Sequence, residues 1–239
     1  MSTRQTPDRT HRRARRLGIV GAVVAALLVL AGCGDDPAPG SASVVNGHKI
    51  STDQVDELAD AQCAGVQQAA KQGQGQAASR KVVTQQALGL LIDIRLNLDF
   101  GKSLGLTPRK EQAQADFAQV KPLIASLPAK YHTFLDGVFE DWADGRDLMT
   151  QVGEESSGTP ATTTNAEQVL DAGYKKRQAW LEKDATITTD ARYAPGKIGW
   201  PGEGDSSVST PVSSYAKAAA KSTPSALFLG NLPSGQRCG

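Results

Sequence analysis

Three cysteines are the residues of this sequence best suited to covalent chemistry, because a thiol can be acylated or oxidised. Cys33 follows a basic and then an uncharged stretch, whereas Cys63 and Cys238 lie far apart in the rest of the chain. Together with His48 and His132, these cysteines show none of the spacings typical of a zinc or iron site. The pattern indicates modification of sulfur, and we expect no metal and no other cofactor.

The segment before Cys33 has the layout of a signal peptide. Six arginines precede an apolar run over residues 17–30 that carries no charge. This run is shorter than the ~18–20 residues that a helix needs to cross a membrane, so a retained membrane helix is the weaker interpretation. The sequence LAGC at Leu30–Cys33 resembles the lipobox of bacterial lipoproteins, which implies cleavage just before Cys33 and a lipid anchor on its sulfur. An ordinary signal peptide with an incidental cysteine is the alternative.

Cys63 and Cys238 remain as a pair once Cys33 carries lipid. In an oxidising compartment, an isolated pair of cysteines is a disulfide candidate. The bond would tie a C-terminal tail rich in Ser, Pro and Gly to the domain and would close a long loop. Two independent reduced thiols are the alternative.

The charge of the mature chain differs from that of the whole sequence. The full chain has 26 basic and 25 acidic residues, and loss of residues 1–32 removes six arginines and one aspartate. The remainder carries a net charge of −4, with its basic residues scattered. This charge gives no electrostatic footprint for nucleic acid, which we exclude as a partner.

A match to one hydrolase motif lies in the wrong secondary structure for catalysis. Residues 101–105 read GKSLG and match the G-x-S-x-G pattern of a hydrolase nucleophile elbow at Ser103. That elbow needs a strand before the serine and a helix directly after it, whereas the sequence predicts a long helix before Ser103 and a turn after it. We therefore expect neither an enzyme nor a small-molecule substrate.

The periodicity of apolar residues predicts a mainly helical domain. Residues 43–47 read as a strand that enters an Asn-Gly turn, and Ser51 with Gln54 forms a capping box that starts the first helix. A helix from Arg80 to Phe100 has two apolar sides, which is typical of a central, buried helix. The Gln/Gly run at 72–76 separates these two helices.

Three further helices are predicted after Gly105. Thr107 and Pro108 provide a cap and a first turn for one helix, and Asn165 provides a cap for the last. Between them lies the cleanest amphipathic pattern of the chain, whose apolar stripe contains Tyr131, Phe134, Leu135, Val138, Phe139 and Trp142. Residues 185–193 then read as extended.

This order of elements resembles the N-terminal domain of SurA-type and PrsA-type extracytoplasmic chaperones. The sequence VVNGHKI at Val44–Ile50, followed by a capped helix, is similar to the opening of that family, and Ile92–Leu106 is similar to its second helix and turn. Arg192 and Tyr193 match the family's closing extended segment, although Ala194 and Pro195 interrupt its Arg-Tyr-Gly ending. The resemblance implies an orthogonal domain of about five helices in which the N-terminal strand pairs with the C-terminal extended segment.

The resemblance also indicates where the domains of this chain begin and end. We expect a signal peptide over 1–32, a flexible tether over 33–42, the helical domain over 43–193, and an irregular tail over 194–239 held by the disulfide. Full family members carry a parvulin prolyl isomerase domain of roughly a hundred residues, and the tail has no room for one. We therefore do not expect isomerase activity.

The expected function is polypeptide binding at a membrane surface. The resemblance implies an ATP-independent chaperone or holdase that shelters unfolded or nascent secreted polypeptides on shallow apolar surface. Phe134, Phe139 and Trp142 are the candidate binding residues, although packing in the core is their commoner role. The alternative is a non-catalytic lipoprotein that keeps this fold and docks one dedicated envelope partner.

Overall fold

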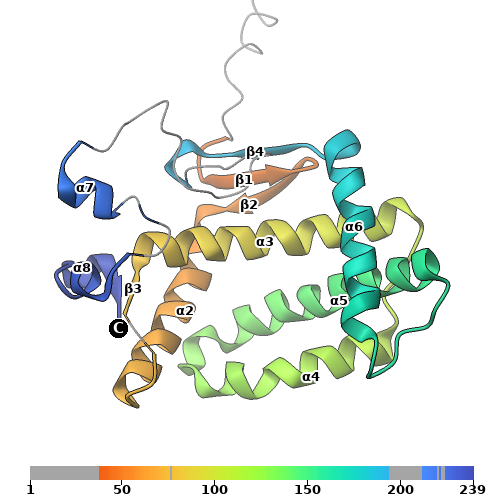
Figure 1. The fold of residues 1–239 in the computed structure, drawn as a ribbon, viewed down its shortest axis with the longest axis horizontal. Coiled ribbons are helices and arrows are strands. Elements are labelled where there is room, and N and C mark those ends of the chain that lie inside the picture. Colours follow the sequence, from red (N-terminus) through yellow and green to blue (C-terminus); the bar gives the residue numbers. More distant parts are fainter. Residues whose placement is uncertain (1–37, 76, 194–211, 220, 222–223) are drawn as a thin grey trace, which may run out of the picture. The chain divides into compact units, whose positions relative to one another are not determined.

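A computed structural model describes residues 38–75, 77–193, 212–219, 221 and 224–239 (Figure 1). The expected signal peptide and Cys33 lie outside the described residues. The described elements belong to one unit, Asp36–Gly239. This unit is mainly helical and carries a small sheet, which confirms the predicted fold class.

A β-hairpin opens the described chain. Strand β1 (Ser41–Val45) pairs antiparallel with β2 (His48–Ser51), and the turn between them has positive φ at both Asn46 and Gly47. This geometry is that of the two-residue turns for which Asn-Gly is preferred, because both residues tolerate the left-handed region. The predicted strand and turn are confirmed, whereas β2 is an additional strand where the sequence suggested only an approach to the helix.

Helix α2 (Thr52–Lys71) begins at the predicted capping box. The Ser51 hydroxyl accepts from Gln54 N–H, and the Gln54 side chain accepts from Ser51 N–H. The helix ends at the Gln/Gly run, as predicted. Its buried stripe, which includes Cys63, packs on α3.

Helix α3 (Arg80–Ser103) is the central helix of the domain (Figure 1). Leu88, Ile92 and Leu96 are completely buried in the main apolar core, while Phe100 belongs to a second core near the other end of the helix. The prediction of a helix that is apolar on two sides is confirmed.

Helix α4 (Lys110–Ser126) starts later than the sequence predicted. Thr107 does not cap it, because the helix begins at Lys110 and Arg109, whose backbone is extended, occupies the cap position. Arg109 N–H donates instead to the Asp147 carboxylate at 2.6 Å, so a distant residue, not a local cap, positions this start. A short 3-10 turn, η2 (Ala129–Tyr131), leads into the next helix.

Helices α5 (His132–Ser157) and α6 (Ala166–Asp184) pack extensively against each other. The predicted α6 cap is wrong in detail, because Asn165 accepts from Thr162 N–H and makes no side-chain bond to α6. A Cβ atom at Gly153 would clash with the Val169 carbonyl, and one at Gly173 would clash with the Met149 carbonyl. The two glycines therefore permit backbone contact between α5 and α6.

The chain returns to the hairpin through β4 (Ile187–Thr189), which pairs antiparallel with β1. Val44 lies opposite Thr188, and Val45 lies opposite Ile187, so the predicted pairing of the two ends of the domain is confirmed. The sheet order is β2-β1-β4, with β2 at one edge. A 3-10 turn, η3 (Ala191–Tyr193), follows.

The C-terminal part returns to α2 and α3. It contains the short helices α7 (Ser214–Ala219) and α8 (Ala226–Gly230) and the turn η5 (Ser234–Gln236). Strand β5 (Arg237–Cys238) then pairs with β3 (Ala78–Ser79), which lies between α2 and α3. The last residues thus lie beside the helical body (Figure 1).

Candidate functional site

A surface groove of about 500 Å³ lies where β2, α3 and α5 meet. Its apolar lining comes from all three elements, which the fold brings together from distant parts of the sequence. Those lining residues are Ile50, Leu91, Ile94, Leu98, Phe134 and Val138. A groove of this composition can take up an apolar side chain of another molecule and contact its polar groups as well, because apolar and polar groups share the lining about equally.

Phe134 is the one predicted binding residue that lines this groove. Its side chain is half-buried and also touches the main core. Phe139 packs against the same core and meets Trp142 edge-on, with ring centroids 6.2 Å apart. The Arg146 guanidinium lies 5.8 Å from the Trp142 ring, and neither Phe139 nor Trp142 lines the groove.

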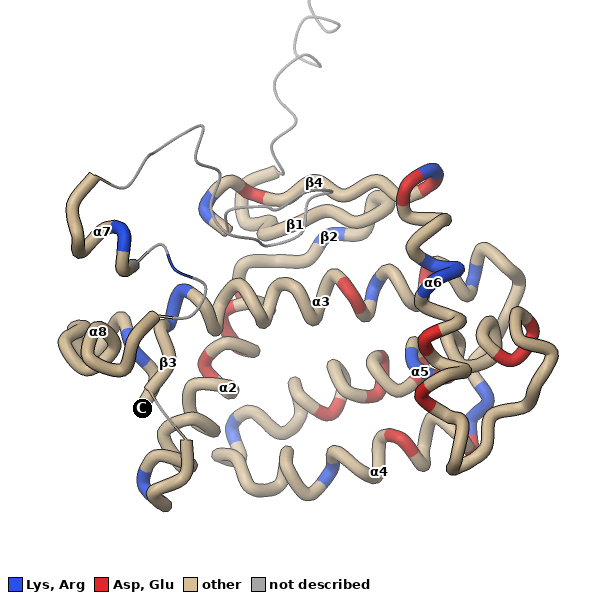
Figure 2. The backbone as a smooth tube through the Cα atoms, in the orientation of Figure 1, with Lys and Arg blue, Asp and Glu red and all other residues tan. Residues whose placement is uncertain are grey.

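The rim of the groove carries charges of both signs. His48 and Lys49 of β2 and Arg95 of α3 form one part of the lining, whereas Glu140 and Asp141 come from α5. Figure 2 shows a basic position on β2 and acidic positions on α5. Arg95 is already ion-paired with Asp99 on its own helix. The free part of the rim therefore has a basic side on β2 and an acidic side on α5.

Asp141 is the rim carboxylate whose proton affinity the fold alters. Partial desolvation raises the pKa of Asp141 above its ordinary value, the positive charge of Arg95 opposes this rise, and the negative charge of Glu140 adds to it. The causes are desolvation and like charge, without a hydrogen bond that would assign the carboxyl a catalytic task. Asp141 thus contributes charge to the rim.

A second polar cluster fixes the backbone instead of lining the groove. The completely buried Asp147 carboxylate accepts from Arg109 N–H, from the Arg109 guanidinium at 2.6 and 2.8 Å, and from Gln151 Nε2 at 2.8 Å. Arg177 of α6 similarly donates to Asp93 and Asn97 of α3. These pairs join helices that are far apart in sequence, and no local pattern would have revealed them.

The serine of the G-x-S-x-G match is hydrogen-bonded within its own helix. Ser103 is the last residue of α3, and its hydroxyl donates to the Phe100 carbonyl at 2.7 Å. His132 lies at the start of α5, where its Nε2 is 2.8 Å from the Leu127 carbonyl oxygen. Within the described ranges, no group of His, Cys, Asp and Glu could hold a metal ion.

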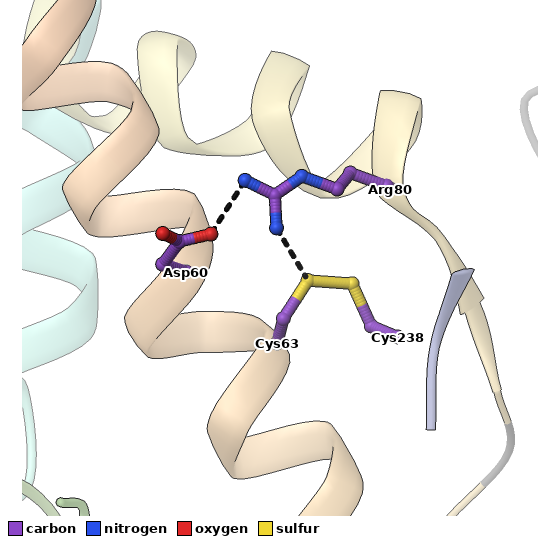
Figure 3. The surroundings of a disulfide bond; sticks show 4 residues. All are labelled: Asp60, Cys63, Arg80 and Cys238. Atoms are coloured by element: carbon purple, nitrogen blue, oxygen red, sulfur yellow. Dashed lines mark hydrogen bonds and ion pairs between the residues drawn. A yellow bond between two sulfur atoms is a disulfide. The ribbon is translucent and has the colours of Figure 1, made fainter. Parts of the chain in front are cut away.

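Cys63 and Cys238 are joined in the structure, with their Cα atoms 4.8 Å apart (Figure 3). Both side chains are buried, Cys63 on α2 and Cys238 on β5. Arg80, the first residue of α3, lies beside this bond: its Nη1 is 4.0 Å from Cys63 Sγ, and its Nη2 is 2.5 Å from Asp60 Oδ1. The sequence suggested the pairing, but it gave no sign of the neighbouring cation.

Comparison with known proteins assigns the chain to a family. The family model of the SurA-like N-terminal domain matches residues 9–130, just over half of the 239 residues, and the chain belongs to this family. This domain is a non-catalytic domain of chaperone type that acts outside the cytoplasm. No curated protein and no solved structure matches the chain. The predicted family is therefore confirmed.

The matched region contains β1, β2, α2, α3 and α4, whereas α5 and the return strand β4 follow it. The groove thus combines three elements of the matched region, β2, α3 and, through Gln54, α2, with one helix outside it. None of the helices that the structure describes is long and apolar enough to cross a membrane.

Proposed function

We propose that this protein is a lipid-anchored extracytoplasmic chaperone that holds unfolded secreted polypeptides in the groove between β2, α3 and α5. The observation that carries the proposal is the apolar lining of that groove in a chain of the SurA-like family. Binding needs no nucleotide, because an apolar segment of the client gains its affinity from burial alone. Such binding is weak and accepts many sequences.

The edge strand beside the groove supports binding of an extended chain. Among the described strands, β2 pairs only with β1, and its residues His48, Lys49 and Ile50 line the groove. An extended polypeptide that runs along β2 forms main-chain hydrogen bonds without regard to sequence and places alternate side chains toward the apolar lining. This mode suits a client that is unfolded and of no fixed sequence.

The anchor places this groove at the membrane surface. The basic stretch, the short apolar run and LAGC at Leu30–Cys33 support lipidation of Cys33. Replacement Cys33→Ala should abolish metabolic labelling by a radioactive fatty acid and leave the signal peptide uncut, which gel mobility measures. Undiminished labelling of the Cys33→Ala protein would contradict the anchor while leaving the groove proposal intact.

The disulfide is part of the same proposal, because an extracytoplasmic compartment permits it. The placement of Cys63 and Cys238 within bonding distance supports the pairing. Peptide mapping by mass spectrometry without reductant should find the peptides of the two cysteines linked. Recovery of both cysteines as free thiols from freshly secreted protein would count against the bond.

Aggregation of an unfolded client tests the binding activity directly. Residues 34–239, produced without lipid, should slow the aggregation of a denatured secreted protein at stoichiometric amounts, as measured by light scattering. The activity should not respond to ATP. A lack of effect on several clients, together with one stoichiometric partner on crosslinking, would favour the dedicated docking protein instead.

A matched pair of variants assigns the activity to the groove. Phe134→Ala removes an aromatic side chain from the apolar lining and should lower the protection against aggregation severalfold. Leu123→Ala is the control, since Leu123 is 60% exposed on α4 and does not line the groove. Circular dichroism checks that both variants keep their helical content. Equal protection by the two variants would place the binding surface elsewhere.

A further inference from the structure

Among the described residues, a cation lies within hydrogen-bonding reach of one of the two disulfide sulfurs, Cys63 Sγ. The Arg80 guanidinium is 4.0 Å from Cys63 Sγ, and its ion pair with Asp60 fixes its position (Figure 3). Within the described part of the chain, Cys238 Sγ has no such neighbour: the adjacent Arg237 turns to the Gly230 carbonyl, to which it donates at 2.8 Å. The surroundings of the bond are therefore electrostatically unequal.

This inequality decides which sulfur leaves when the bond is opened. In thiol–disulfide exchange, a thiolate attacks one sulfur and the other departs as a thiolate, and the reaction is faster when the departing thiolate is stabilised. A positive guanidinium stabilises negative charge on Cys63 Sγ. Attack at Cys238 is therefore favoured, because it leaves the new charge next to Arg80.

We propose that the Cys63–Cys238 bond is a site of thiol–disulfide exchange with a dithiol reductant, which attacks Cys238 and releases the C-terminal segment from the helical body. The first thiolate of the dithiol bonds to Cys238 Sγ, and the electron pair of the broken bond goes to Cys63 Sγ. The second thiol of the reductant, once deprotonated, attacks the mixed disulfide. The products are two protein thiols, after protonation, and one cyclic disulfide of the reductant, which balances the two electrons transferred.

Access to the buried bond comes from the short strand that carries Cys238. Cys63 is 5% exposed and Cys238 is fully buried, so the reductant must wait for local opening. Strand β5 has only two residues and pairs with the equally short β3. A pair of two-residue strands opens with little free energy, so β5 can separate while α2 and α3 stay folded.

Opening of the bond changes the apolar surface of the protein. A Cβ atom at the last residue, Gly239, would touch Val66 of α2 and Ala77 beside β3, so the chain end covers this part of the body. The released segment also carries Leu229 and Leu232, both buried while β5 is in place. Reduction therefore exposes apolar groups on both the helical body and the released segment. The redox state of the bond thus controls how much apolar surface the protein exposes to solvent.

The rate of reduction under native conditions tests the assignment. The full chain, purified in detergent, is exposed to dithiothreitol at neutral pH, and free thiols are counted over time by a maleimide mass tag. We expect reduction while the helical circular dichroism is retained. Arg80→Gln should slow the reaction by at least about threefold, because the departing thiolate loses its cation, and Arg80→Lys should restore most of the rate. Lys121→Gln, which breaks a surface ion pair with Asp136 elsewhere, should leave the rate unchanged.

The opposite result separates this role from a structural one. If Arg80 only holds the region together through Asp60, Arg80→Gln should loosen β5 and accelerate reduction, which would overturn the proposal. A monothiol probe, glutathione, followed by an acid quench and mass spectrometry, should give the adduct on Cys238, and an adduct mainly on Cys63 would also overturn it. If the protein is isolated with both cysteines as free thiols, the disulfide does not form and the exchange proposal is overturned. The aggregation assay tests client binding by the groove independently of this result.

Discussion

Asp147 has no exposed surface, and the hydrogen bonds to its carboxylate hold the chain where α4 begins. Asp147→Ala should lower the free energy of unfolding by about 2–3 kcal/mol, because the Arg109 N–H and guanidinium lose their hydrogen bonds to a charged acceptor. Glu154→Gln is the matched control, because Glu154 pairs with the same arginine but is more exposed to solvent than Asp147. This substitution should lower the free energy of unfolding by less than about 1 kcal/mol. Urea denaturation measures both, and equal effects would contradict the role of burial.

Asp144 provides a prediction for pH. Burial raises the pKa of this carboxyl above its ordinary value, and the negative charges of Asp141, Asp147 and Glu140 add to the rise. A raised carboxyl pKa means that the folded state binds its proton more tightly than the unfolded state, so the stability contributed by Asp144 falls as pH rises through the interval between the two pKa values.

The substitution Asp144→Asn should therefore raise the urea midpoint at pH 7. The gain should disappear below about pH 4, where the carboxyl is protonated in both states. Glu155→Gln serves as the control, since Glu155 is exposed near the end of the same helix and its removal changes the net charge equally. A midpoint increase of the same size in both variants would falsify the desolvation argument and point to net charge alone.

The contact between α5 and α6 depends on two glycines, which gives a prediction at the scale of elements. Gly173→Ala should destabilise the protein by more than about 2 kcal/mol, although alanine favours helix, because the added methyl group meets the Met149 carbonyl of α5. Gly137→Ala lies inside α5 with nothing within 4 Å of the added Cβ, and it should stabilise by about 0.5–1 kcal/mol. Thermal melts compare the two, and a stable Gly173→Ala protein would show that the helices can separate without cost.

The elements were predictable where a local pattern determines them. The Ser51–Gln54 capping box and the two apolar sides of α3 depend on residues within a few positions of one another, and both predictions are confirmed. The start of α4 was missed because Arg109 is held by Asp147, 38 residues away. Strand β2 was missed because four residues between a turn and a helix cap carry little pattern of their own.

The groove shows the same limit at the scale of the whole molecule. The sequence identified Phe134 as a member of an apolar stripe, but it did not distinguish this residue from Phe139 and Trp142. The distinction depends on which side of α5 faces β2 and α3, and only the packed structure supplies it. No local pattern predicts the charged rim either, because its cations and its carboxylates come from different elements.

The pairing of β1 with β4 makes the two ends of the domain depend on each other, and this sets how the chain can be divided. A fragment 34–130, which ends with the matched family region, lacks α5 with its buried Leu135 and Met149 and lacks β4. A fragment 34–193 keeps these elements and lacks only the C-terminal segment. We expect the longer fragment to unfold cooperatively in urea with high helical circular dichroism, and the shorter one to show neither property, because large buried side chains of α2 and α3 lose their partners. Residues 34–239 are the reference for both, and cooperative unfolding of fragment 34–130 would show that α5 and β4 are additions to a domain that folds without them.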